Sequence, residues 1–265
     1  MTLRLDANLR WLYTEWPQAE RAAAAAADGF TGVEVAFPYA TPASDYKGQL
    51  DALGLHLVQV LAPLEWDAGE RGLAGLPGRE DDFARSVQVA VAYALQCGRP
   101  LIHPALGNVP PGADRGRCLA VATENLRLAA DAAAAHGLTV LVEACCTARF
   151  PDFLLHSIDE TVRLIEAVGR DNFKLCFDTW HVQMESGGLD EPLARAWPHI
   201  AHVQLGDAPG RNEPGTGHVD FGRFLQALER RGWSGWVGLE YTPLRDTRSS
   251  LQWARDLGLL PARAA

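Results

Sequence analysis

The sequence has no apolar run of the roughly 18–20 residues that a membrane-spanning helix needs. Residues 1–6 read Met-Thr-Leu-Arg-Leu-Asp, without the basic start and apolar core of a secretory signal. Lys and Arg are also in the minority, at 24 against 33 Asp and Glu, for a formal net charge of −9. An acidic surface repels phosphate backbones and anionic lipid. We therefore expect a cytoplasmic protein with neither nucleic acid nor membrane as a partner.

Cysteine is sparse and irregularly placed. Its five occurrences are an odd number without regular spacing, which argues against a disulfide framework and fits a reducing compartment. The adjacent pair Cys145 and Cys146 is interpreted as lining a strand exit, and a redox or metal-binding role is the alternative.

Short apolar runs of strand length alternate with helix-like segments along the whole chain. The pattern predicts a (β/α)₈ TIM barrel, α/β in class, with residues 1–265 in a single domain. A doubly wound open sheet is the alternative, but it usually carries a glycine-rich phosphate turn after its first strand, and none is present. The expected strands are residues 3–8, 32–37, 56–61, 100–104, 138–143, 173–178, 200–204 and 236–240. The expected helices are residues 16–28, 44–53, 80–97, 113–136, 157–168, 189–196, 221–231 and 246–257.

Four polar residues each close one of the last four expected strands: Glu143, Asp178, Gln204 and Glu240. In a parallel barrel the carboxyl ends of the strands meet at one mouth, so these side chains should share a small volume. Three carboxylates in such a volume are unstable unless a cation lies among them. An all-oxygen set of this kind suits Mg²⁺ or Mn²⁺. The alternative for each residue alone is an ordinary strand-ending polar group that caps a helix or meets solvent.

Further polar residues follow the same strand ends. His181 can bond a substrate oxygen or transfer a proton, and its alternative is a helix-start histidine facing solvent. Arg211 lies in a loop dense in Gly and Pro and can clamp a substrate carboxylate through two N–H groups, or else be a surface charge. Glu34 and His103 are interpreted as satisfied polar groups at the rim rather than as ligands.

Short motifs spread over nearly the whole chain carry a family resemblance. The most specific are Ala-Gly-Glu-Arg-Gly at residues 68–72 and Glu-Pro-Gly-Thr-Gly at residues 213–217. Others are Gly-Phe-Thr-Gly-Val-Glu at residues 29–34, His-Val-Gln at residues 202–204 and Gly-Trp-Val-Gly at residues 235–238. On these motifs the chain resembles the hydroxypyruvate isomerase family, within the xylose-isomerase-like barrel superfamily.

The resemblance implies that Glu143, Asp178, Gln204 and Glu240 hold one divalent ion. It also implies that Glu143 and Glu240 form the acid/base pair, and that His181 and Arg211 contact the substrate. Related ketose 3-epimerases have histidine at the position of Gln204, which favours the hydroxypyruvate and 2-oxo-tetronate isomerase branches. One departure is the segment 144–147, Ala-Cys-Cys-Thr, where the family usually has a polar segment with Asn. Because this segment borders the expected pocket, a different substrate stays open.

The implied reaction interconverts hydroxypyruvate and tartronate semialdehyde (2-hydroxy-3-oxopropanoate) through an enediolate. It needs no nicotinamide or flavin, since the redox change is internal to the substrate. The nearest alternatives are a 2-oxo-tetronate isomerase and a ketose 3-epimerase acting on a larger sugar or sugar acid, and a non-catalytic sugar-binding barrel is an alternative of another class. Abasic-site nucleases share the barrel, but the acidic balance and Gln204 argue against that activity. The expected partner is a small keto acid or keto sugar, and the sequence leaves the oligomeric state, including a homo-oligomer, open.

Overall fold

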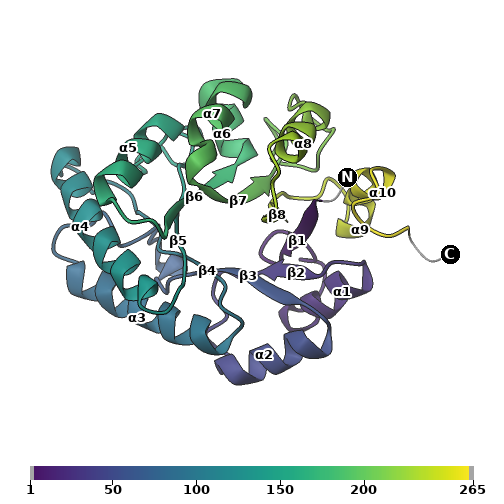
Figure 1. The fold of residues 1–265 in the computed structure, drawn as a ribbon, viewed down its shortest axis with the longest axis horizontal. Helices are drawn as coiled ribbons and strands as arrows, with labels where there is room; N and C mark the ends of the chain where they lie inside the picture. Colours follow the sequence, from purple (N-terminus) through teal and green to yellow (C-terminus); the bar gives the residue numbers. More distant parts are fainter. Residues whose placement is uncertain (1–2, 263–265) are drawn as a thin grey trace.

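Eight parallel strands close into one barrel in chain order (Figure 1) in the computed structural model, which describes residues 3–262. The first and last strands pair in register, with Asp6 opposite Gly238. This architecture confirms the predicted TIM barrel. The strands are β1 (Arg4–Asn8), β2 (Gly32–Glu34), β3 (His56–Leu61), β4 (Leu101–His103), β5 (Val140–Val142), β6 (Phe173–Asp178), β7 (Ile200–Leu205) and β8 (Trp236–Leu239).

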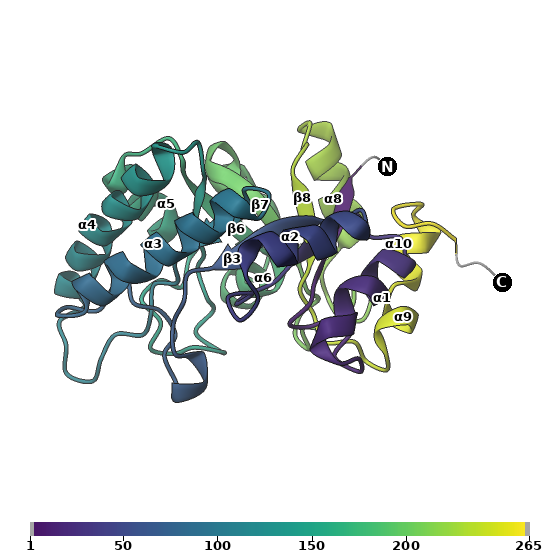
Figure 2. The ribbon, with the colours of Figure 1, turned by 90° about the horizontal axis from the view of Figure 1, so that it is seen from below.

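Helices surround the barrel on its outside, and the long loops that follow the strands gather at one end (Figures 1 and 2). The predicted capping box at Ser157 and Glu160 is present and starts α5. The helices are α1 (Arg21–Ala27), α2 (Ala43–Ala52), α3 (Glu80–Gln96), α4 (Arg115–Ala134), α5 (Ile158–Val168), α6 (Thr179–Ser186), α7 (Asp190–Ala196), α8 (Phe221–Arg230), α9 (Thr247–Ser250) and α10 (Gln252–Asp256), with short 3-10 helices η1 (Gln18–Glu20), η2 (Trp66–Ala68) and η3 (Trp197–His199).

Two helix predictions were wrong. The sequence interpretation missed α6, because Asp178 both ends β6 and caps α6: its Oδ1 accepts the N–H groups of Trp180 at 2.7 Å and His181 at 3.2 Å. No loop residue separates β6 from α6, so the sequence carries no Gly, Pro or other loop signal between them. The single tail helix expected over residues 246–257 is instead two short helices, which meet at Leu251 with φ −88° and ψ 0°.

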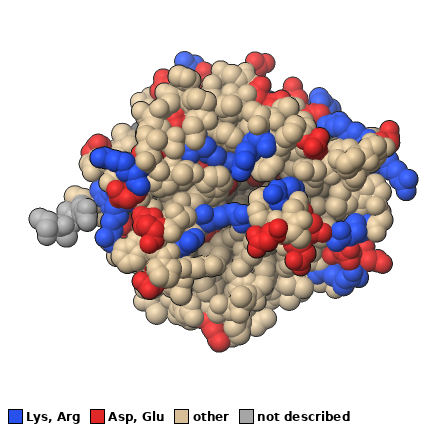
Figure 3. Space-filling view, turned by 180° about the vertical axis from the view of Figure 1, so that it is seen from behind, with Lys and Arg blue, Asp and Glu red and all other residues tan. Residues whose placement is uncertain are grey.

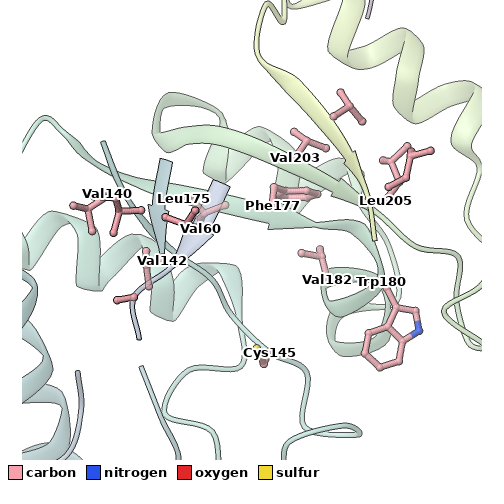
Figure 4. Close-up of a cluster of buried hydrophobic side chains, with 14 of the residues drawn as sticks. Val60, Val140, Val142, Cys145, Leu175, Phe177, Trp180, Val182, Val203 and Leu205 are labelled. Atoms are coloured by element: carbon pink, nitrogen blue, oxygen red, sulfur yellow. The ribbon is translucent and has the colours of Figure 1, made fainter. Parts of the chain in front are cut away.

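Strand bounds agree best where both faces of a strand are buried. The bounds of β3 and β6 match the prediction residue for residue, whereas β2 stops at Glu34, where its register with β3 shifts. Apolar side chains pack between the barrel strands and the surrounding helices (Figure 4), and Phe177 stacks on Phe224 of α8 at 5.9 Å. Burial of each such side chain stabilises the fold by about 1.5–3 kcal/mol. This packing fixes the strand ends that carry the polar residues.

Two further observations concern the cysteines and the helices. The five cysteines are free and buried. Within residues 3–262 no helix has the length and apolarity to cross a bilayer.

Candidate active site

A cavity of about 580 Å³ opens at the carboxyl ends of the strands. Its mouth lies on the face shown in Figure 3, where Lys and Arg side chains surround a hollow. The volume is within the range of about 300–1,000 Å³ usual for small-molecule sites. Five of the six sequence-predicted site residues line this cavity: Glu143, His181, Gln204, Arg211 and Glu240. The sixth, Asp178, is 1% exposed and is not among the lining residues.

Glu143 directly follows β5 and offers an unpartnered oxygen to the site. Its Oε1 is buried without a hydrogen bond, and the nearest counter-group is His181 Nε2 at 3.9 Å. Burial raises the pKa of Glu143 well above its usual value, and the charges of Asp178 and Glu240 raise it further. This carboxyl group therefore strongly favours binding a proton or a cation.

Arg211 joins two of the predicted ligands. Its Nη2 lies 2.5 Å from Asp178 Oδ2 and 2.8 Å from Glu240 Oε1. The Arg211 residue is 7% exposed. The guanidinium carbon lies 4.5 Å from the ring centroid of Trp11 and 4.8 Å from that of Trp180. A buried cation thus already balances part of the negative charge at the mouth. Burial raises the pKa of Glu240 to about 8 even though Arg211 opposes that shift, and Asp178 adds to it.

The loop that carries Arg211 has a fixed, irregular conformation, as its Gly and Pro content suggests. One carboxylate, that of Asp207, holds it. Asp207 Oδ2 accepts the N–H groups of Gly215, Thr216 and Gly217 at 2.8–3.0 Å, and its Oδ1 accepts that of Val219 at 3.0 Å. Such a loop holds Arg211 in one place without regular secondary structure.

His181 is a neutral, buried imidazole, and its alternative as a solvent-facing histidine is wrong, because it is 3% exposed. Each ring nitrogen faces a fixed donor: Nδ1 lies 2.9 Å from the Cys146 N–H, and Nε2 lies 3.1 Å from Arg211 Nη1. The neutral ring can accept from one of these donors, and a second ring proton would leave neither with an acceptor. Burial lowers the pKa of His181 well below its usual value, and Arg211 lowers it further. The ring therefore stays uncharged at neutral pH.

A buried network lies beneath these groups and was underestimated from the sequence. Glu34 is 1% exposed, inside the barrel rather than at its rim. Its Oε2 accepts from Asn8 Nδ2 at 2.9 Å and Gln204 Nε2 at 2.7 Å, and its Oε1 lies 2.7 Å from His202 Nε2. Asn8 Nδ2 also donates to Glu240 Oε2 at 3.2 Å. Glu34 thus fixes the Gln204 amide and, through Asn8, one oxygen of Glu240.

Asp6 lies next to this network, with 0% exposure and no hydrogen-bond partner for either carboxylate oxygen. Burial raises its pKa well above the usual value, and the charge of Glu34 raises it further. Gly238 makes room for the network, because a Cβ there would stand 1.9 Å from Glu34 Oε1. The sequence signal for these residues was a polar group inside an apolar strand, as in Leu-Asp-Ala-Asn of β1 and Gly-Val-Glu of β2.

His103 also lines the cavity, from the end of β4. It is 7% exposed, and burial lowers its pKa to about 4. It therefore adds a neutral polar group to the wall and no charge at neutral pH.

The sequence is similar to those of known proteins over most of its length. The sequence model of the xylose isomerase-like TIM barrel family matches residues 22–257. The chain is 42% identical to 2-oxo-tetronate isomerase of Cupriavidus necator, over 95% of this chain and 97% of that protein. It is 35% identical to hydroxypyruvate isomerase of Escherichia coli, over 95% of this chain and 98% of that protein.

Solved structures show the same fold. A Brucella melitensis protein described as an AP endonuclease of family 2 superimposes with a TM-score of 0.92 at 37% identity, covering 96% of this chain and 99% of that one. The D-psicose 3-epimerase of Clostridium cellulolyticum H10 superimposes with a TM-score of 0.80 at 18% identity, over 96% of this chain and 99% of that one. The chain therefore belongs to the xylose isomerase-like TIM barrel family, in the group that includes the hydroxypyruvate and 2-oxo-tetronate isomerases, as its motifs indicate.

Proposed function

We propose that the protein is an isomerase of short 2-keto acids that carry a neighbouring CH–OH group, with hydroxypyruvate as the first candidate substrate. The observation that carries the proposal is the pair Glu143 and Glu240, two carboxyl groups that directly follow β5 and β8 and line one cavity. A carboxyl group whose pKa approaches the working pH can both remove and return a proton. The names of the relatives from Cupriavidus necator and Escherichia coli support the same reaction class.

We propose that a divalent ion binds among the four polar strand-end residues at this mouth. Glu143 Oε1 is buried and unpartnered, and Gln204 and Glu240 line the same cavity. The Gln204 oxygen now accepts from Cys176 Sγ at 3.1 Å. Asp178 would join through Oδ2, the atom that now bonds Arg211. We propose Mg²⁺ or Mn²⁺ because all four donors are oxygens. When bound, the ion would polarise the substrate ketone and offset the negative charge of the enediolate.

The residues of the chain divide the proton transfers. One glutamate of the pair takes the C3 proton of hydroxypyruvate, which gives the enediolate. C2 then receives a proton, and the hydroxyl proton passes from the C3 oxygen, which becomes the aldehyde, to the C2 oxygen, which becomes the hydroxyl. Arg211 keeps Glu240 in place from one side, and Asn8 does so from the other. Neutral His181 lines the same cavity and adds no charge to it. Strand-end positions hold both glutamates close to the reacting carbon.

A second candidate substrate, 2-oxo-tetronate, has support of its own. A three-carbon acid fills only a small part of a cavity of about 580 Å³, so a four-carbon acid also fits. The relative from Cupriavidus necator carries the name of that activity at 42% identity.

Two other functions have less support. A nuclease of this fold would need several metal ions with histidine ligands, but among the described residues only His103 and His181 line the cavity. A sugar-binding barrel would bind its ligand without proton transfer, and it would give no reason for two carboxyl groups with raised pKa values at the mouth.

The test is an assay of hydroxypyruvate and 2-oxo-tetronate with added Mg²⁺ or Mn²⁺, for the wild type and for Glu240→Gln. We expect turnover of at least one keto acid, and a loss of about 10²–10⁴-fold in the variant. The control is Glu191→Gln, an exposed residue in the first turn of α7. Isomerisation at the wild-type rate by folded Glu240→Gln would reject the acid/base role.

A further inference from the structure

Three arginines at the cavity form no ion pair among the described residues, although the protein carries an excess of carboxylates. Arg10, Arg71 and Arg149 all line the cavity, and within residues 3–262 none of them forms an ion pair with a carboxylate. Many other arginines do, such as Arg85 with Asp82 on α3. Unpaired cations at a concave site in an acidic protein favour an anionic ligand.

Two of these arginines share one aromatic ring. The guanidinium carbon of Arg10 lies 4.5 Å from the ring centroid of Trp66, and that of Arg71 lies 4.2 Å from it. Cation–π contact holds each planar group in a fixed orientation without using its N–H donors. Two like charges held this close repel each other, and an anion between or beside them removes that repulsion. Trp66 itself lines the cavity.

The donors of this pair are largely free. Arg71 Nη1 donates to the backbone oxygens of Trp66 at 3.1 Å and Glu70 at 2.8 Å, which leaves its Nη2 and Nε without a partner among the described residues. The Arg10 side chain has no hydrogen bond within residues 3–262. Arginine offers five N–H donors in a fork that matches a carboxylate.

Arg211, the arginine expected from the sequence to clamp the substrate carboxylate, is differently placed. Its Nη2 already bonds Asp178 and Glu240, its Nε donates to the Glu240 backbone oxygen at 3.3 Å, and its Nη1 faces His181. A substrate carboxylate there would also lie against two acidic side chains. Arg211 is therefore better placed to hold the site carboxylates than to bind the acid end of a substrate.

Arg10 and Arg71 lie close enough to Glu240 to bind the same small molecule. The Arg10 backbone N–H donates to Asn8 Oδ1 at 3.1 Å, and Asn8 Nδ2 donates to Glu240 Oε2 at 3.2 Å. Burial lowers the pKa of Arg10, and the charge of Glu240 acts against that lowering. Asn8 therefore links the Arg10 backbone to the Glu240 side chain, and the charge of Glu240 reaches the Arg10 guanidinium.

We propose that Arg10 and Arg71, stacked on Trp66, form the subsite that binds the substrate carboxylate, and that this Arg10–Trp66–Arg71 subsite selects keto acids over neutral ketoses. The assignment rests on the proposed function for the identity of the substrate, but the anion-binding site itself does not. Arg149, stacked on Phe150 at 5.3 Å, adds positive charge to the cavity wall.

The test measures binding and turnover separately, in the full-length protein with Mg²⁺ present. D-glycerate, a three-carbon acid without a ketone, is titrated by calorimetry into the wild type, Arg10→Gln, Arg71→Gln and the control Arg85→Gln. Arg10→Gln is the principal variant, because it removes no hydrogen bond of the fold. We expect each subsite variant to weaken glycerate binding about tenfold and the control to leave it unchanged. For the keto acid that the wild type isomerises, KM should rise by a similar factor with kcat within about threefold.

The outcomes separate the subsite from the function. Glycerate binding that both variants retain within twofold, or no glycerate binding by the wild type, overturns the subsite. Loss of glycerate binding in the variants supports the subsite even if no keto acid is turned over, a result that would instead reject the proposed isomerase. An unchanged KM for a keto acid in both variants would reject the subsite and leave the isomerase standing.

Discussion

Replacing Glu34 by alanine removes the acceptor of three buried hydrogen bonds at once. The donors are Asn8, Gln204 and His202, at 2.7–2.9 Å from the carboxylate. Each buried donor left without a partner costs about 1–3 kcal/mol, and removing one member of a buried charged set typically costs about 3–5 kcal/mol. We take the second figure for the whole change. At about 2–4 °C per kcal/mol for a chain of this size, the melting temperature of Glu34→Ala should fall by about 6–20 °C.

The matched variant Glu34→Gln should be much milder. The glutamine oxygen can accept from Asn8 and Gln204, and its amide can donate to His202 Nε2 if the ring proton moves to Nδ1. That shift is open to His202, because its Nδ1 is buried without a partner. Glu34→Gln therefore keeps the hydrogen bonds and loses only their charge. Its melting temperature should lie between those of the wild type and Glu34→Ala.

The assay for this prediction combines thermal melts with kinetics on the keto acid that the wild type isomerises. Without Glu34, the side-chain amides of Gln204 and Asn8 lose their shared acceptor. Asn8 is then less firmly held and positions Glu240 Oε2 less well. Small misplacements of catalytic groups can cost about 10²-fold in rate, so we expect kcat of Glu34→Ala to fall by more than tenfold. Glu191→Gln serves as the control, with a stability change below about 1 kcal/mol. A melting temperature for Glu34→Ala within 2 °C of the wild type, a margin of about 1 kcal/mol, would refute the reasoning.

Two further predictions concern the ionisation of Asp6 and the divalent ion. Because the pKa of Asp6 is raised in the folded state, its contribution to stability is fully present below the unfolded pKa near 3.9 and is lost as the pH rises toward the raised value. Asp6→Asn cannot ionise, so its melting temperature relative to the wild type should increase from pH 5 to pH 8. A constant difference would show that Asp6 binds no more protons in the folded state than in the unfolded state over that range. Removing divalent ions with a chelator should abolish isomerisation, and Mg²⁺ or Mn²⁺ should restore it. Full activity in a preparation verified by elemental analysis to be metal-free would contradict the proposed role of the ion.

The barrel was predictable from the sequence because parallel strands buried on both faces read as continuous apolar runs, as in β3 and β6. The positions of Glu143 and Glu240 followed from the same runs, since each residue directly follows its strand. Helix α6 could not be found that way, because Asp178 is at once strand end and helix cap. The structure therefore supports part of the ordinary interpretation of Asp178: Oδ1 caps a helix, and Oδ2 faces Arg211.

Side-chain pairs that meet across the barrel could not be predicted from the sequence. Glu34 and His202 lie 168 positions apart, and only barrel closure brings them within 2.7 Å. The partners of Arg211 likewise depend on how the loop after β7 folds back over β6 and β8. The sequence also could not show that Arg10 and Arg71 form no ion pair, because no local pattern distinguishes a paired arginine from an unpaired one.

The most direct test of the central claim, that Glu143 and Glu240 move protons on a keto acid, is hydrogen exchange in D₂O followed by NMR. The account predicts that the wild type exchanges a C3 hydrogen of hydroxypyruvate or 2-oxo-tetronate with solvent, and that Glu240→Gln slows this exchange by at least about 10²-fold. Binding of both acids without any enzyme-dependent exchange, or equal exchange by the wild type and a folded Glu240→Gln, would contradict it.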